Sequence, residues 1–214
     1  MGSVATGASE RRWRLLAGLI ALCAWAGLGA ELILSFAHVH SLTLALWRLA
    51  LFFTILSNLL VAIVFTGIAL GSMRLRHPLL LGGLAMTMAL VGSVFELMLR
   101  RLLDPHGWRA FSTGLLHDAV PLLTAAAWFF LAEKGRLRAR DPWLIALFPI
   151  AYLGYALIRG ALGGTYPYPF INPDKIGWTG VAAYVVGLSA AFLIFAHLLV
   201  KLDGWLARRN GSGA

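Results

Sequence analysis

The sequence predicts an all-α integral membrane protein built from six transmembrane helices, on three observations. Of the 214 residues, 60% are hydrophobic and 13% are charged, whereas a soluble domain carries about 25% charged residues. The mean hydropathy is +0.80. Six apolar runs each reach the length of about 20 residues that crosses a hydrocarbon core. A single cysteine, Cys23, excludes an internal disulfide framework and a paired-cysteine redox or zinc site.

Each apolar run is assigned to one helix of a single domain. The runs lie at 15–36, 49–71, 78–99, 113–132, 143–163 and 177–200. Arginines before the first run make it similar to a signal peptide, but its length of about 22 residues favours a retained span. Because the connections are short, we expect a compact antiparallel bundle. This domain is predicted over residues 11–205, with a disordered N-terminal tail at 1–10 and a C-terminal tail at 206–214.

The placement of lysine and arginine predicts the orientation in the membrane. Twelve of the 18 basic residues fall on one side: Arg11, Arg12, Arg14, Arg74, Arg76, Lys134, Arg136, Arg138, Arg140, Lys201, Arg208 and Arg209. The opposite side has Arg48, Arg100, Arg101, Arg109, Arg159 and Lys175. By the positive-inside rule, this bias predicts a multi-pass protein of the cell (inner) membrane with both termini in the cytoplasm. The same rule accounts for the net charge of +9 without a nucleic-acid partner.

The longest outer connection has the sequence GGTYPYPFINPDKIGW, residues 163–178. Its glycines and prolines cannot continue one regular helix, so it is predicted to be a loop or a cap over the mouth of the bundle.

Polar residues within the predicted spans gather near the outer ends. Thr54 lies about five residues, or about 8 Å, below the outer end of its span. The ionisable residues at a similar depth are Glu31, Glu96, His117, Asp118 and Arg159. An ionisable group inside a span costs about 2.5–3.5 kcal/mol and usually faces a bundle interior, a cavity or a partner. We therefore predict a polar site at the outer end of the bundle.

Thr54 is the candidate nucleophile of this site and His117 the candidate base. A threonine hydroxyl needs a base within hydrogen-bond reach, and an imidazole can take and return a proton near neutral pH. Ser57 and Asn58 share the helix face of Thr54 through the i, i+3, i+4 relation. The alternative is that these polar groups only join helices, as is frequent in membrane bundles, and that His117 is a packed histidine.

The acidic residues have structural alternatives as well. Asp118 follows His117 directly and on a helix points about 100° away from it, so a pairing with Arg159 or a neighbouring span is expected. Glu31 and Glu96 are expected to be protonated in apolar surroundings or to form ion pairs with Arg48, Arg100, Arg101 or Arg159. The further alternative is that they orient a base or a water.

A metal or haem site is not predicted. The histidines on the outer side, His38, His40, His106 and His117, show no HExxH or comparable spacing, and three of them fall in connections. Only His117 is placed within a span, whereas haem needs axial histidines that face each other. A GxSxG elbow and a phosphate-binding loop are also absent from the sequence.

Three short patches resemble the androgen-induced-protein family of multi-pass transmembrane threonine hydrolases, which includes the androgen-dependent TFPI-regulating protein and bacterial six-span relatives. They are FFTILSN, LLHDAVP and YPYPF, spread between about residues 48 and 180. In the resemblance Thr54 matches the nucleophile, His117 the base, and Tyr168, Pro169 and Phe170 the Tyr-Pro-Phe of the last outer connection. The chain departs from the animal members at Ser57, where they have an acidic residue.

The resemblance implies a hydrolase of lipid carboxyl esters, similar to hydrolases of fatty acid esters of hydroxy fatty acids. It implies an acyl group on Thr54, a lipid ester taken from the bilayer and no cofactor. Substrate-binding or support roles are expected for Ser57, Asn58, Asp118, Glu31, Glu96, Arg159, Tyr166 and Tyr168. The alternative is a non-enzymatic lipid- or small-acid-binding or transport protein with an outer-facing polar pocket.

Overall fold

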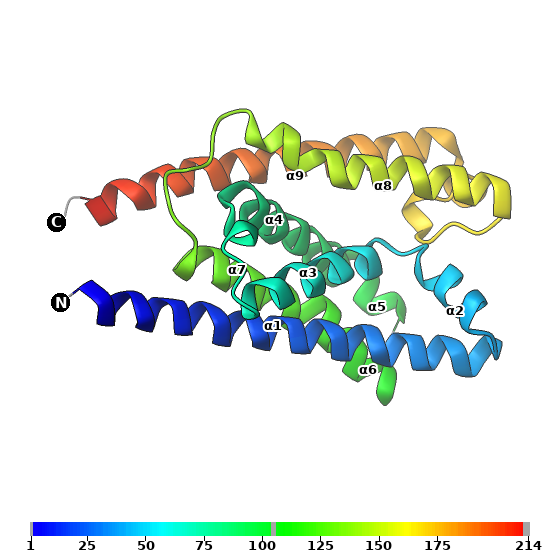
Figure 1. The fold of residues 1–214 in the computed structure, drawn as a ribbon. Helices are drawn as coiled ribbons and strands as arrows, with labels where there is room; N and C mark the ends of the chain where they lie inside the picture. Colours follow the sequence, from blue (N-terminus) through cyan, green and yellow to red (C-terminus); the bar gives the residue numbers. More distant parts are fainter. Residues whose placement is uncertain (1, 104–105, 212–214) are drawn as a thin grey trace. The chain divides into compact units, whose positions relative to one another are not determined.

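The computed structural model describes residues 2–103 and 106–211, and regular structure within these ranges is entirely helical (Figure 1). The helices are α1 (Gly2–Val39), α2 (Leu42–Leu49), α3 (Phe53–Ala69), η1 (Arg74–Arg76), α4 (Pro78–Val94), η2 (Phe95–Leu99), α5 (Arg100–Leu103), α6 (Trp108–Thr113), η3 (Gly114–Ala119), α7 (Val120–Leu131), α8 (Asp141–Gly163), η4 (Pro169–Ile171) and α9 (Pro173–Gly211). The all-α prediction is confirmed for the described chain.

Five helical stretches are long and apolar enough to cross a membrane: Glu10–Val39, Pro78–Leu103, Trp108–Leu131, Asp141–Gly163 and Pro173–Arg209. A sixth candidate is the pair α2 and α3, which are bent by 98° at their junction. The predicted run 49–71 therefore begins as a helix only at Phe53, because the chain turns sharply just before it. A membrane protein with five or six spans agrees with the helix count expected from the sequence.

The described chain divides into two compact units. The first contains the residues up to Ala50 and Thr54–Glu133, and the second contains Leu51–Phe53 and the residues from Lys134 onward. Helix α1 is continuous from Gly2 and α9 continues to Gly211, through stretches that the sequence assigned to tails. The single domain over 11–205 stays a prediction.

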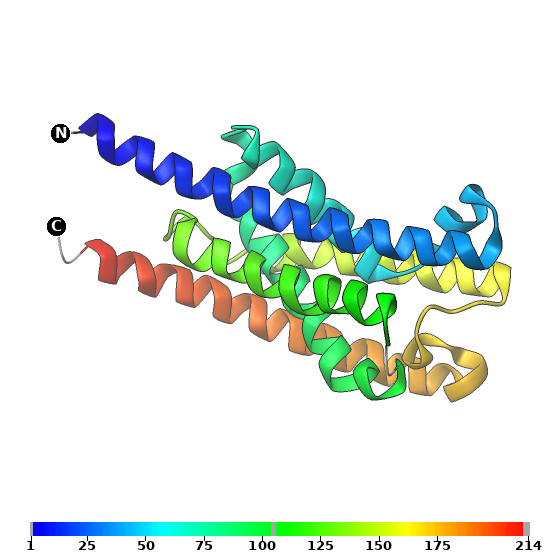
Figure 2. The ribbon, with the colours of Figure 1, turned by 90° about the horizontal axis from the view of Figure 1, so that it is seen from below.

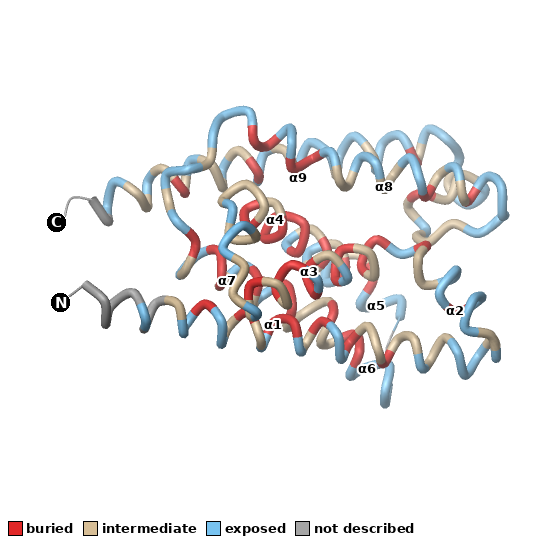
Figure 3. Tube along the Cα trace, viewed as in Figure 1, coloured by how far each residue is buried: buried red, intermediate tan, exposed pale blue. Residues whose placement is uncertain are grey.

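In the first unit, α4 packs against α7, and α1 runs beside α6, η3 and α7. The buried residues are concentrated on α3, α4 and α7, as the colouring of the tube in Figure 3 shows. Gly92 of α4 lies close to the chain at His117: a Cβ placed there would be 3.2 Å from the His117 carbonyl oxygen. At this distance, a side chain at position 92 would require the neighbouring backbone to move by a few tenths of an ångström.

Two turns of π-helix interrupt the long helices of the first unit. Phe95–Leu99 continues α4, and Gly114–Ala119 joins α6 to α7. In the second turn, the N–H of Val120 donates to the carbonyl of Leu115, five residues earlier, in place of the usual four. Pro121 follows and has no N–H to continue the ladder. In this five-residue register, Pro121 supplies no N–H to the carbonyl of Leu116.

In the second unit, α8 and α9 lie side by side (Figure 2). Helix α8 is followed by its C-cap residue Gly164, whose φ of 66° is left-handed. The predicted irregular connection is a loop with the short helix η4, and α9 is kinked at Gly177. The hydroxyl of Tyr168 accepts the N–H of Phe53 (3.0 Å), and that of Tyr152 donates to the carbonyl of Leu51 (2.8 Å). The two tyrosines thus bond to the backbone just before α3, at Leu51, and at its first residue, Phe53.

Candidate functional site

Thr54 and His117 lie in hydrogen-bond contact in the first unit. The Oγ1 of Thr54, in the first turn of α3, is 3.3 Å from the Nε2 of His117, in the π-helical turn η3. The two residues are 63 positions apart in the chain and belong to different helices. Thr54 is only 9% exposed. The sequence-predicted nucleophile and base are therefore adjacent, and their catalytic roles stay predictions.

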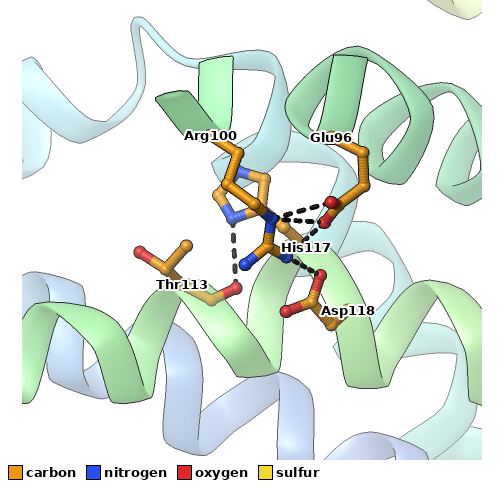
Figure 4. A network of polar contacts seen from close by, with 5 residues as sticks. All are labelled: Glu96, Arg100, Thr113, His117 and Asp118. Atoms are coloured by element: carbon orange, nitrogen blue, oxygen red, sulfur yellow. Dashed lines mark hydrogen bonds and ion pairs between the residues drawn. The ribbon is translucent and has the colours of Figure 1, made fainter. Parts of the chain in front are cut away.

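The ring of His117 is oriented by its other nitrogen. Its Nδ1 contacts the backbone carbonyl of Thr113 (Figure 4), and the two atoms are 3.2 Å apart. A carbonyl oxygen can only accept, so Nδ1 carries the proton, and in the neutral ring Nε2 is then an acceptor. The hydroxyl of Thr54 consequently donates to Nε2. This is the hydrogen-bond direction that removal of a proton from the hydroxyl requires.

Phe95 fixes the plane of this imidazole. Its ring stacks on that of His117, with centroids 4.1 Å apart and an interplanar angle of 29°. Phe95 is fully buried and belongs to the other π-helical turn, η2. The histidine is thus held by one hydrogen bond on each nitrogen and by an aromatic face, which leaves the ring little rotational freedom.

Asn58 connects the two helices that carry the pair. Its Nδ2 donates to the carbonyl of Thr54 (2.9 Å) and to the carbonyl of Leu116 (3.1 Å), the residue before His117. Both hydrogens of the amide nitrogen are used in these bonds, so Asn58 has no donor left for a ligand.

Two buried polar atoms beside the pair have no hydrogen-bond partner in the described part of the chain: Ser57 Oγ and Asn58 Oδ1. Both residues are 0% exposed. Ser57 Oγ can donate or accept, whereas Asn58 Oδ1 can only accept. Of the two residues, only Ser57 therefore has a side-chain donor that is still available.

Three charged residues near His117 form a network between the two helices that contain the π-helical turns. The guanidinium of Arg100 bonds to Glu96 on the same helix and, at 2.7 Å, to Asp118 on η3 (Figure 4). Asp118 thus pairs with a neighbouring helix, one of the two alternatives expected from the sequence. The guanidinium also lies 5.0 Å from the centroid of the Phe95 ring. The network links the two turns from which Phe95 and His117 project.

The remaining predicted residues have other partners. Glu31 of α1 accepts a hydrogen bond of 2.5 Å from the buried hydroxyl of Ser112, where the sequence suggested an ion pair with an arginine. Arg159 donates to the hydroxyl of Tyr155 (2.5 Å) in the second unit. Tyr166 packs against Gly160 in that unit, which also contains Tyr168.

Sequence reasoning missed Thr113, Phe95 and Ser112 as partners of the site, whereas Arg100 was among the arginines expected to pair with Glu96. The common signal of the missed residues was weak, because a carbonyl partner can belong to any residue and an aromatic ring is ordinary in an apolar span. Pro121 was a usable signal, since a proline inside a span predicts unpaired carbonyls nearby. In the described ranges no group of three or more His, Cys, Asp and Glu side chains is arranged to hold a metal ion.

The fold and site thus define a helical protein with five or six potential membrane spans and a buried threonine–histidine hydrogen bond. No protein-family model, curated protein or solved structure matches the chain.

Proposed function

We propose that the chain is a membrane-embedded hydrolase of lipid carboxyl esters, with Thr54 as nucleophile and His117 as general base. The observation that carries the proposal is the 3.3 Å contact from Thr54 Oγ1 to His117 Nε2, together with the hydrogen bond that puts the proton on Nδ1. The resemblance to transmembrane threonine hydrolases supports the choice of ester substrate. The cell membrane and cytoplasmic termini belong to the same proposal.

In the first half-reaction, Thr54 Oγ1 gives its proton to His117 Nε2 and bonds to the ester carbonyl carbon. The tetrahedral intermediate collapses when His117 returns the proton to the leaving alkoxide, which departs as the alcohol. The second half-reaction repeats these steps with water, which His117 deprotonates. The acyl–Thr54 bond then breaks, Thr54 regains its proton and the fatty acid is released.

The oxyanion requires donors near Thr54, and the start of α3 supplies them. The first N–H groups of a helix have no acceptors within it, and the helix dipole is positive at this end. The N–H groups of Thr54 and Ile55 occupy this position in α3. We assign them, with the unpartnered hydroxyl of Ser57, to the oxyanion.

The test uses purified Thr54→Ala and His117→Ala in detergent or nanodiscs. Each should unfold at nearly the wild-type temperature but lose ester turnover and labelling by a phosphonate probe directed at hydroxyl nucleophiles. Thr66→Val is the matched control, because it removes a different side-chain hydrogen bond of α3, the one that Trp25 Nε1 donates to Thr66 (3.1 Å). Thr66 lies about 18 Å along the helix from Thr54. Turnover that survives in either active-site variant refutes the proposal.

The same proteins test the non-enzymatic alternative. A lipid- or acid-binding protein would be stabilised by its ligand without turnover. Substitutions that change the charge at Glu31, Glu96 or Arg159 would then weaken binding more than Thr54→Ala does.

A further inference from the structure

Asn58 makes specific hydrogen bonds that a residue filling space between helices would not need. Its side chain is 0% exposed, and its Nδ2 bonds to two backbone carbonyls, those of Thr54 and Leu116. Because both partners are acceptors, the amide orientation follows from them: a flipped amide would place Oδ1 against two carbonyl oxygens. One acceptor belongs to Leu116, the residue before the candidate base. The other belongs to Thr54, the candidate nucleophile.

The carbonyl of Leu116 is available because of Pro121. The N–H of Val120 donates to Leu115, so it does not follow the usual four-residue spacing to Leu116. In the five-residue register of the π turn, the donor for Leu116 would be residue 121, and proline has no N–H. A buried carbonyl without a partner is costly, and Asn58 supplies the missing donor.

We propose that Asn58 is a positioning residue that ties α3 to the π-helical turn at the carbonyl left unpaired by Pro121, and so sets the distance from Thr54 to His117. As a statement about catalysis, this inference rests on the proposed function. As a statement about geometry, it does not, because it concerns the hydrogen bond between Thr54 and His117. An asparagine that only packed would be replaceable by leucine without any effect on this hydrogen bond.

The test reads the hydrogen bond directly. In protein with ¹⁵N-labelled histidine, the Nε2 resonance of His117 is assigned by its loss in His117→Gln. Thr54→Val removes the donor and defines the resonance position of Nε2 without its partner. Asn58→Leu should move the resonance to that position, while Thr66→Val, which removes a different interhelical bond of α3, should leave it unchanged.

Kinetics provides the second readout. Asn58→Leu should lower kcat by about 100-fold, the size of effect expected for a displacement of about 1 Å between reacting groups. The KM should change much less, because Asn58 has no free donor for the substrate. If Asn58→Leu does not fold, the double variant Asn58→Leu/Pro121→Ala restores an N–H for Leu116, and the resonance is read in that background.

The outcomes separate the two proposals. A shifted His117 resonance in Asn58→Leu supports the positioning role even if the wild-type protein hydrolyses no ester, a result that would refute only the proposed function. An unshifted resonance in Asn58→Leu overturns the positioning role whether or not Thr54 is the nucleophile. Where Thr54→Ala abolishes turnover, a wild-type kcat in Asn58→Leu overturns it as well.

Discussion

Gly92 offers the sharpest test of the packing that places His117. A Cβ at this position would lie 3.2 Å from the His117 carbonyl oxygen and 3.5 Å from Pro121 Cβ. Carbon–oxygen contacts of this kind are usually about 3.3–3.6 Å, so Gly92→Ala must push the π-helical turn away by a few tenths of an ångström. The displaced atom is backbone, which cannot rotate aside as a side chain does.

The effect on stability should be small and the effect on turnover larger. Overpacking costs about 1–3 kcal/mol, and alanine in place of glycine returns about 1 kcal/mol of helix stability. The contact of 3.3 Å between Thr54 and His117 has little room to lengthen before the hydrogen bond is lost. With about 100-fold lost per ångström of misplacement, a shift of a few tenths should lower kcat about 3- to 10-fold at unchanged KM.

The assay is ester turnover of purified Gly92→Ala, with thermal unfolding measured on the same preparation. Gly29→Ala in α1 is the matched control, because a Cβ there meets no atom within 4 Å. The control should keep full turnover and unfold at the wild-type temperature or above. Equal turnover in Gly92→Ala and Gly29→Ala would refute the reasoning that the contact at Gly92 places the base.

Two further predictions concern the second unit. Tyr168→Phe removes the acceptor of the Phe53 N–H and should lower the free energy of unfolding by about 1 kcal/mol, whereas Tyr166→Phe should change it less; equal losses in thermal unfolding would contradict this. Burial lowers the pKa of Lys134 from its ordinary value of 10.5. The unfolded chain therefore binds the proton of Lys134 more tightly than the folded chain does, and near pH 7 this difference lowers the free energy of unfolding. The loss of stability should diminish as the pH rises toward 10.5. Lys134→Met should flatten that rise in the unfolding temperature, and an unchanged pH dependence would speak against it.

Much of the fold followed from the sequence because apolar length is a strong signal. A stretch of about 20 apolar residues must satisfy its own backbone, and in a membrane only a helix does so with a single segment. The all-helical structure and most of the helical stretches were therefore predictable. The bend of 98° before α3 was not, because Leu49–Phe53 is as apolar as the helix that follows it.

The sequence was enough to select the residues of the candidate pair and their depth in the spans. It was not enough to predict how their side chains are oriented. Thr54 and His117 stood out because polar groups are costly inside a span. The ring orientation depends on a carbonyl of Thr113, and the tie through Asn58 depends on a carbonyl of Leu116. Backbone carbonyls are present at every position, so the sequence does not show which of them remain free.

By itself, then, the sequence determined that the chain is helical, that its helices suit a membrane, and that a threonine and a histidine are its chemically notable polar residues. Only the tertiary structure decided that their side chains meet at 3.3 Å and that the proton of the imidazole lies on the far nitrogen. The physical reason is that hydrophobic composition and periodicity are properties of a single chain segment. Hydrogen-bond direction and distance arise where α3 and the π-helical turn before Pro121 pack together.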